Sequence, residues 1–504
     1  PFLFPITKPI PRLLIGYTGV KGVCYEATTQ GGGGNWRIAN AYLKGAAKQF
    51  GIDYSWYTAS FYTGAKRGSD TIESGENNFG PPMKGYDFFG PWRGASLQII
   101  DRQNAYGWLI GARYTETENA GTYHVRIDKD GKRTPMSAAY DYQRLHTLAK
   151  TVDRGTPVSP LGLAFPFHDK LGYSGSPVYF TAPGPSGVVL TLSPGDHRRV
   201  KDMRLQGGEG GFYNSEFPDF YNIVTPDAYN DVEKAYAALK PYPAIVMSGR
   251  FRPETTPSAA FTRYVEEGGL LYLSEEYVRE GTINAKLTGV SFPAKKVFGA
   301  GDWLIDETGK KTALEAPYVF KAGEPTTAKL FWKDENGAVI AYVNDYGKGK
   351  VITVTATAML PDDYNRGWGI NDPLMSGEYV HRLSSGKVKC NILREIFRRE
   401  RDRLMPVEVA GDIHYGLNKT KKGYLIWFFN NKGITNFIGE EPQVDHAFDE
   451  KVTFAFKNGF KPSKLTEVVA SAPVNPAIKQ SGNQTIPEFS LTVPAGLWRA
   501  VVVE

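Results

Sequence analysis

The chain has 504 residues, a formal net charge of +6 and an apolar fraction of 41%. This length predicts about three domains with ordinary cores, and an aromatic fraction of 13% disfavours a disordered chain. The sequence has no basic run interleaved with aromatic residues, which disfavours nucleic-acid binding, and no run of about eighteen apolar residues that would span a membrane.

The first 155 residues alternate strand-like and helix-like segments, a pattern typical of parallel β/α units. The predicted elements are, in chain order, a strand with its loop (13–26), a helix (35–50), a strand (52–62), a short strand (86–92), a helix (96–106), a strand (108–118) and a helix (135–152). These make about four β/α units, half of a closed (β/α) barrel. We therefore expect residues 1–155 to form the C-terminal half of such a barrel.

Residues 156–404 again alternate short apolar strands with helices, the order of a flavodoxin-like, doubly wound α/β domain. A β-rich excursion at 285–350 interrupts this pattern. A hairpin with a Gly-Lys-Gly turn follows at 338–360, and a helix at 388–404 ends the domain. The charged run at 397–403 is predicted to be the solvated face of that helix.

From residue 405 to residue 504 the pattern changes to short strands about ten residues apart, which predicts a small antiparallel β-sandwich. The fold class expected for the whole chain is therefore α/β, with a partial barrel, a doubly wound domain and a C-terminal sandwich.

The two cysteines, Cys24 and Cys390, have no CxxC partner, so the sequence holds no zinc motif. Burial is favoured over a disulfide for both. The sequence begins without Met and without a signal peptide, so the missing signal says nothing about the compartment. This start is typical of the interior of a larger gene product, and we expect the first half of the barrel to come from a second polypeptide or a preceding segment.

Carboxylates at the ends of two apolar runs are the main candidates for catalysis. Glu116 and Glu118 close the run 107–118, and Glu26 precedes four consecutive glycines. Carboxylates in such places are costly to desolvate and are seldom there for stability. Glycoside hydrolysis uses one carboxylic acid to protonate the leaving oxygen and one carboxylate to attack or to activate water.

Glu116 and Glu118 differ by two positions, so on a strand they point to the same side. The structural alternative for these glutamates is a salt bridge to Arg113 or Arg102. For Glu26 the glycine-rich loop leaves the direction of the side chain open.

Aromatic and basic residues near the predicted strand ends are candidates for sugar binding, because sugar rings present C–H faces that stack on aromatic rings. Trp56, Tyr57 and Trp92 are the predicted platforms, and Arg93 is a candidate for a hydroxyl or an anionic group. Two further tryptophans (Trp36, Trp108) are predicted to lie in the core, and two charged residues (Asp101, Arg102) to form a structural pair.

Nucleophilic catalysis by the middle domain is disfavoured. No Cys occurs between positions 25 and 389, and Ser248 and Ser274 follow strands without the glycines of a G-x-S-x-G turn. His168 and His197 have no nucleophile beside them in the sequence. The segment GGEGGF at 207–212 lacks the Lys-Ser/Thr of a phosphate loop.

The chain resembles β-galactosidase-type glycoside hydrolases of the family-forty-two kind. The segments that carry the resemblance are EATTQGGGGNWRIANAYLKGAAKQFGIDYSWY, GPWRGASLQIIDRQNAYGWLIGARYTETE, GYLIWFFNNKG and VPAGLWRAVVVE. The resemblance implies a class I glutamine amidotransferase-like domain at 156–404 that helps the protein form a homo-oligomer. It also implies hydrolysis of a poly- or oligosaccharide without a cofactor or metal.

One departure from the family bears on the mechanism. The paired catalytic glutamates of the family lie at the ends of the fourth and seventh barrel strands. If counting back from the end of the barrel places the fourth strand before Pro1, Glu26 is not the family's acid. Two hypotheses follow. The chain is either a hydrolase with Glu26 as acid and Glu116 or Glu118 as nucleophile or base, or an inactive carbohydrate-binding or assembly subunit.

Overall fold

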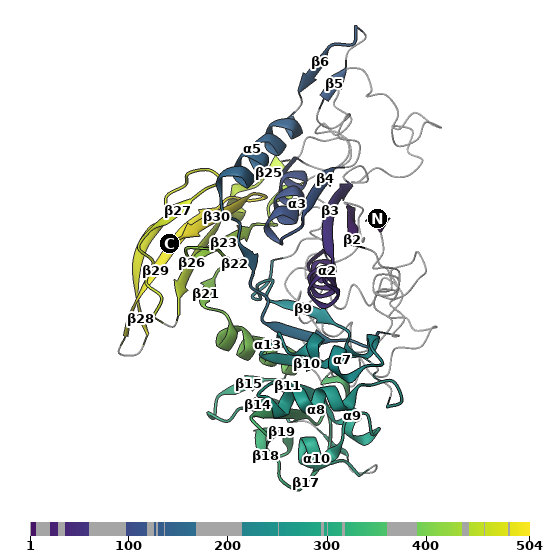
Figure 1. Ribbon diagram of the computed structural model, residues 1–504. Helices are drawn as coiled ribbons and strands as arrows, with labels where there is room; N and C mark the ends of the chain where they lie inside the picture. Colours follow the sequence, from purple (N-terminus) through teal and green to yellow (C-terminus); the bar gives the residue numbers. More distant parts are fainter. Residues whose placement is uncertain are drawn as a thin grey trace, which may run out of the picture.

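The computed structural model describes residues 2–6, 21–28, 36–59, 97–117, 125–127, 130–135, 137–167, 214–249, 251, 253–293, 297–299, 301–314, 318–359, 391–435, 443–457, 459–481 and 484–504. Three large groups of strands are found in these residues, and helices lie between and beside them (Figure 1). No helix in the described ranges is both long and apolar enough to cross a membrane.

The first group is a sheet of four parallel strands that are neighbours in chain order: β1 (Phe2–Ile6), β2 (Gly22–Thr28), β3 (Asp53–Ala59) and β4 (Tyr114–Thr117). Helix α2 (Trp36–Phe50) connects β2 to β3, and α3 (Leu97–Leu109) precedes β4. Helix α5 (Ser137–Thr151) and the small hairpin β5 (Val125–Ile127) and β6 (Arg133–Pro135) follow. Strand–helix–strand alternation with parallel neighbours is the arrangement that the sequence predicts here.

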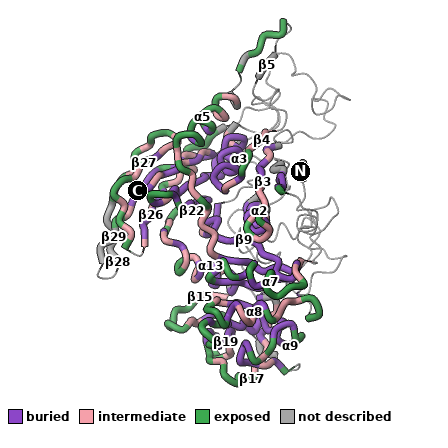
Figure 2. The backbone as a smooth tube through the Cα atoms, viewed as in Figure 1, coloured by how far each residue is buried: buried purple, intermediate pink, exposed green. Residues whose placement is uncertain are grey.

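The second group is a nine-stranded mixed sheet. Its parallel strands lie in the order β9 (Tyr221–Val224), β8 (Leu161–Ala164), β10 (Ala244–Met247), β11 (Leu270–Ser274) and β20 (Gly349–Val354). Numbered along the chain this order is 2-1-3-4-5, the flavodoxin-like order. Strands β8, β9 and β10 are buried at every residue (Figure 2). Helices α7 (Val232–Leu239), α8 (Ser258–Glu266), α9 (Glu275–Arg279) and α10 (Ala285–Thr288) flank these strands.

Antiparallel strands extend the second sheet beyond β20 in the order β19 (Val339–Tyr346), β18 (Lys329–Lys333), β14 (Trp303–Ile305) and β15 (Lys311–Ala313). Two short ladders lie in the same stretch of chain: β12 (Val290–Ser291) with β17 (Glu324–Pro325), and β13 (Val297–Gly299) with β16 (Val319–Lys321). The expected β-rich excursion is therefore confirmed. The expected hairpin is also confirmed, as β19 and β20.

The third group is a pair of antiparallel sheets formed mainly by the C-terminal hundred residues. One has the order β21 (Val407–Ala410), β26 (Glu450–Phe456), β29 (Gln484–Val493) and β28 (Asn475–Ser481). The other has the order β27 (Leu465–Glu467), β30 (Trp498–Val503), β23 (Tyr424–Phe429), β22 (His414–Lys419) and β7 (Thr156–Pro157). The two-stranded ladder β24 (Ile434–Thr435) and β25 (Gln443–Val444) lies beside them. Strand β7 comes from far upstream and pairs with β22, so residues 156–157 are tied to this group.

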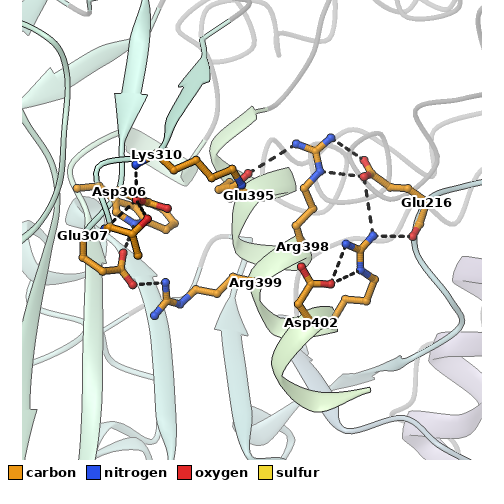
Figure 3. Close-up of polar contacts among 11 residues, drawn as sticks. Glu216, Asp306, Glu307, Lys310, Glu395, Arg398, Arg399 and Asp402 are labelled. Atoms are coloured by element: carbon orange, nitrogen blue, oxygen red, sulfur yellow. Dashed lines mark hydrogen bonds and ion pairs between the residues drawn. The ribbon is translucent and has the colours of Figure 1, made fainter. Parts of the chain in front are cut away.

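Helix α13 (Asn391–Leu404) carries the arginine-rich run, and its polar face is engaged by other parts of the protein (Figure 3). Arg398 holds the carboxylate of Glu216 with its Nε at 2.8 Å, and Arg401 donates to the Glu216 carbonyl oxygen at 3.0 Å. On the other side, Arg399 binds Glu307. The prediction of a merely solvated face was wrong, because these arginines anchor the helix to two neighbouring segments.

A buried carboxylate, Asp219, joins the three groups of strands. Its Oδ1 accepts a hydrogen bond from Arg37 Nε at 2.8 Å and lies 3.2 Å from His414 Nε2. Its Oδ2 accepts from the Tyr106 hydroxyl at 2.5 Å and from Asn40 Nδ2 at 3.4 Å. Arg37 and Asn40 belong to α2, Tyr106 to α3 and His414 to β22. All five residues are buried.

The charges around Asp219 determine which groups are ionised. Burial opposes ionisation, but the interaction with His414 and the charge of the Arg37 guanidinium hold the pKa of the Asp219 carboxyl well below its ordinary value. Burial also lowers the pKa of His414 to about 4, so that ring is neutral near pH 7 and Arg37 supplies the balancing charge there. Lys44, on the same face of α2, donates to the Asp219 carbonyl oxygen at 3.1 Å, and burial lowers its pKa to about 8.

We predict that Asp219→Asn strongly destabilises the fold, because it leaves the buried guanidinium of Arg37 without its counter-charge. The expected loss in the free energy of unfolding is about 3–5 kcal/mol, measured by urea denaturation. The control is Asp345→Asn, which removes an exposed ion pair with Lys350 and is expected to cost less than about 1 kcal/mol. Equal stability of the two variants would contradict the central role of Asp219.

We also predict that the contribution of His414 to stability is lost as the pH falls from about 6.5 to about 4. The unfolded chain takes up a proton on His414 near its ordinary pKa of about 6.5, whereas the folded state resists it until about 4. The unfolded state thus binds more protons in this window, so the free energy of unfolding decreases as the pH decreases. Urea denaturation of His414→Gln at several pH values should show a flatter slope, whereas the exposed control His446→Gln should keep the wild-type slope.

Candidate active site

Three candidate positions lie in one row across the parallel sheet of β1 to β4. Glu26 on β2 is the register partner of Tyr57 on β3, and Tyr57 is the register partner of Glu116 on β4. Each position lies close to the carboxyl end of its strand. Adjacent strands are about 4.8 Å apart, so the backbones at positions 26 and 116 are separated by about 10 Å.

The row lies on the face of the sheet that points away from α3. Trp56 packs its ring against Tyr106 of α3, with ring centroids 5.2 Å apart. The hydroxyl groups of Thr58 and Thr117 both lie within hydrogen-bond distance of Asn104 Oδ1, also on α3. Because successive strand residues alternate between faces, positions 57 and 116 lie on the opposite face. In a (β/α) barrel, where helices form the outer ring, that face is the interior.

Glu116 is half-buried and is not held by either arginine that the sequence offered as a partner. Arg113 instead binds Asp53, and Arg102 donates to the backbone oxygen of Gly496. The carboxylate of Glu116 has no hydrogen bond or ion pair with the described part of the chain, so the structural alternative for this residue was wrong.

The prediction of a strand over 108–118 was wrong in its first half. Residues 108 and 109 are the last residues of α3, and β4 begins only at Tyr114. The helix ends at Gly111, which has a positive φ of 98°, with the backbone bonds Gly111 N to Trp108 O and Ala112 N to Gly107 O. This pair of bonds is a Schellman cap. The apolar run therefore belongs to a capped helix end, and Glu116 follows on a short, partly exposed strand.

Trp56 was predicted to be a sugar platform, and the structure corrects this. Its side chain is 0% exposed, lies against Tyr25 as well as Tyr106, and is in close contact with α3. A Cβ added at Gly107 would lie 2.8 Å from three atoms of the indole side chain. The ring is therefore a core residue and presents no face to a sugar. Tyr57, the next residue, is half-buried on the other face.

The remaining sequence candidates divide into two groups. Glu118, Trp92 and Arg93 lie outside the described residues, as do Cys390, the predicted strand at 86–92 and the histidines at positions 168 and 197. Trp108 and Cys24 are buried, as expected.

Asp101 and Arg102 do not form the predicted pair with each other, but both have structural roles, because each connects α3 to the C-terminal strands through other partners. Asp101 Oδ2 accepts hydrogen bonds from Trp498 Nε1 at 2.8 Å and from Arg144 Nη2 at 2.7 Å. Arg102 reaches the backbone at Gly496.

Sequence reasoning missed the Asp219 cluster, which is the most strongly perturbed set of ionisable groups near this sheet. One signal was present: Arg37, Asn40 and Lys44 recur at helical spacing in a segment that is otherwise rich in small and apolar residues. Such a polar stripe on a buried helix needs a buried counter-charge. No group of three or more possible metal ligands is found within the described residues.

No family model matches the sequence, and no curated protein matches it either. Among solved structures, Gan42B, a GH42 β-galactosidase from G. stearothermophilus, matches with a TM-score of 0.50 and 8% identity. The match covers 96% of this chain and 60% of that chain. The β-galactosidase from the haloarchaeon Halorubrum lacusprofundi matches with a TM-score of 0.46 and 9% identity, again over 96% and 60% of the two chains.

The chain thus has a fold like that of GH42 glycoside hydrolases, as the resemblance in its sequence implies. At such low identity the similarity shows the fold alone. The chain spans about 60% of the length of the solved β-galactosidases that it matches.

We predict that Trp56→Ala acts on stability rather than only on ligand binding. Removing a fully buried indole from the contact with α3 is expected to cost about 3–5 kcal/mol in urea denaturation. The control is Trp303→Ala, since Trp303 is 42% exposed and is expected to change stability by about 0.5 kcal/mol or less. A Trp56→Ala variant of wild-type stability that had lost carbohydrate binding would restore the original assignment.

Proposed function

We propose that this protein contributes to a glycoside hydrolase site, and that Glu116 and Glu26 are its carboxylates. The observation that carries the proposal is the row of Glu26, Tyr57 and Glu116 at the carboxyl ends of three adjacent parallel strands. The carboxyl ends of the strands are where (β/α) barrel enzymes place their catalytic residues. The GH42-like fold supports the same reaction class.

The spacing of the row suits paired-carboxylate chemistry. Retaining glycosidases hold the two carboxyl groups about 5–5.5 Å apart, and inverting enzymes about 6.5–9.5 Å apart. Two glutamates whose backbones are about 10 Å apart can bring their carboxyl groups to either separation, depending on whether their side chains point toward each other or run parallel. In this proposal Glu116 is the nucleophile or base, and Glu26 is the acid. The two roles need no cofactor.

Tyr57 lies between the two carboxylates, so its hydroxyl is placed to bind either a carboxylate or a sugar hydroxyl. Glu118, two residues after Glu116, is a second candidate for the nucleophile, because that spacing returns to the same face of an extended strand. Trp92 would stack on the sugar, and Arg93 would bind a hydroxyl or an anionic group. The substrate class is a poly- or oligosaccharide.

A complete barrel would need further strands. A closed (β/α) barrel has eight parallel strands, and the described residues contribute four to the first sheet. We propose that a second polypeptide, or another segment of the same gene product, supplies the others. The middle part of the chain would be a glutamine amidotransferase-like domain that supports a homo-oligomer.

A binding role is the second candidate, and one feature of β3 favours it. The family's carboxylates belong to the fourth and seventh strands, and β3 is the seventh strand if β4 is the eighth. At the level of the row β3 carries Tyr57, and its one carboxylate is Asp53, at the opposite end of the strand. A protein with a glycosidase-derived barrel that binds sugar without cleaving it would tolerate a tyrosine in place of the family's carboxylate on this strand.

We predict that Glu116→Gln and Glu26→Gln each lower kcat for p-nitrophenyl glycoside hydrolysis by about 10²–10⁴-fold in the native sample, because each removes a general acid, a base or a nucleophile. A panel of p-nitrophenyl sugars identifies the substrate. The matched control is Glu408→Gln, an exposed glutamate on β21, which should retain full activity. Equal thermal stability of all three variants shows that the losses are chemical.

Two further measurements separate the roles. If Glu116 is the nucleophile of a retaining enzyme, added azide should restore turnover in Glu116→Ala with a glycosyl azide of inverted anomeric configuration, whereas a retained configuration would make Glu116 the acid/base. Intact-mass analysis of the native sample tests for a co-purifying second polypeptide. Saturable binding of an oligosaccharide without hydrolysis, lost in Glu116→Gln, would replace the hydrolase with the binding candidate.

A further inference from the structure

The nine-stranded sheet has a second place where a ligand is expected on physical grounds. Its parallel strands have the order 2-1-3-4-5, so the chain reverses direction across the sheet between β8 and β10. In open α/β sheets the connections at this reversal go to opposite faces and leave a crevice outside the carboxyl ends of the strands, where such proteins bind ligands. Helix α9 starts at the same edge, directly after β11 (Figure 1).

Two serine residues lie side by side at this edge. The register Val246 to Tyr272 between β10 and β11, continued by two residues, brings Ser248 next to Ser274. The backbone at Ser248 is still part of the sheet, because its N–H donates to Ala164 O at 2.9 Å. Ser248 is only 5% exposed, yet its hydroxyl makes no hydrogen bond within the described ranges.

The carboxylates beside the serines have different environments. Glu275 is engaged by the structure: its Oε1 accepts from the Thr357 hydroxyl at 2.6 Å and its Oε2 from Arg279 Nε at 3.0 Å. Glu276 accepts one hydrogen bond, from the Ser274 hydroxyl to Oε1 at 3.1 Å. Its other oxygen has no partner within the described ranges. Burial raises the pKa of Glu276 to about 7, because the charged form of this carboxyl group is poorly hydrated.

We propose that Ser248, Ser274 and Glu276 form a binding site for a small, neutral, hydroxyl-rich molecule at the carboxyl edge of the nine-stranded sheet. Hydroxyl groups both donate and accept, so they can serve the Ser248 hydroxyl and the open oxygen of Glu276 together. The two carboxyl groups, Glu275 and Glu276, favour a neutral ligand over an anionic one such as a phosphate. The site is separate from the row on β2 to β4 and does not depend on the hydrolase proposal.

The test is titration of the native protein with D-galactose and, in a second arm, with myo-inositol, followed by saturation-transfer NMR. The Glu116→Gln background removes a contribution from the sugar site proposed on β4. We expect saturable binding of at least one probe that persists in Glu116→Gln. We expect Ser248→Ala and Glu276→Gln each to weaken it by about tenfold or more, because each removes a hydrogen bond to a buried polar group.

The matched control is Ser291→Ala on β12, a half-buried serine outside the crevice, which should bind as the wild type does. Glycosidase activity measured in Ser248→Ala should be unchanged, so the two proposals can fail separately. Glu276→Gln keeps the shape of the side chain and guards against loss of folding. Absence of saturable binding by both probes, or binding that neither variant weakens, overturns this site.

Discussion

The arrangement of the three sheets depends on one buried carboxylate. Asp219 contacts residues from α2, α3 and β22, and a charged group without partners could not remain in such a place. Arg37 makes the burial possible, because its guanidinium balances the charge and also donates to the Phe217 backbone oxygen at 2.6 Å. The cluster therefore defines one relative position of these elements, whereas apolar contacts alone tolerate small shifts.

This constraint reaches the candidate site through α2. The helix begins eight residues after β2 ends, and its polar stripe fixes its rotation against β9. The approach is close: a Cβ added at Gly45 would lie 1.8 Å from the Ile223 carbonyl oxygen. Because α2 packs this closely, its position also restrains the strands that it connects, β2 and β3. The register of β2 with β3, and hence the placing of Glu26 opposite Tyr57, then follows from contacts remote from the row itself.

The parts predictable from the sequence were those with a local cause. The periodicity of α2 and the glycine turn between β19 and β20 depend on neighbours in the chain. The end of α3 was instead predicted as the start of a strand. The face of the sheet on which Trp56 lies could not be predicted. The sequence around a tryptophan at a strand end is the same whether the ring faces a helix or a binding site, and only the packing against Tyr106 decides between them. The arginines of α13 and the role of Asp219 depend on partners that are 92 or more residues away, which no local pattern encodes. Glu116 was proposed as a site residue because of its chemistry, although the strand assigned to it was too long.

The face of the four-stranded sheet that points away from α3 changes character along the strands. This change is the physical basis for proposing a site at the carboxyl ends of the strands. One row below Glu26, Tyr57 and Glu116, the sheet carries Cys24 and Ser55, which are small and almost fully buried, and the exposed Tyr114 on β4. A barrel interior is a packed core at that level, and small side chains there leave room for neighbours from facing strands. At the next row the residues become large and polar, and Tyr57 and Glu116 are only half-buried. A core that continued upward would carry apolar side chains at these positions. Two carboxylates flanking a tyrosine are costly there unless they meet water or a substrate. That cost is the strongest argument that the row functions in binding or catalysis and not only in folding.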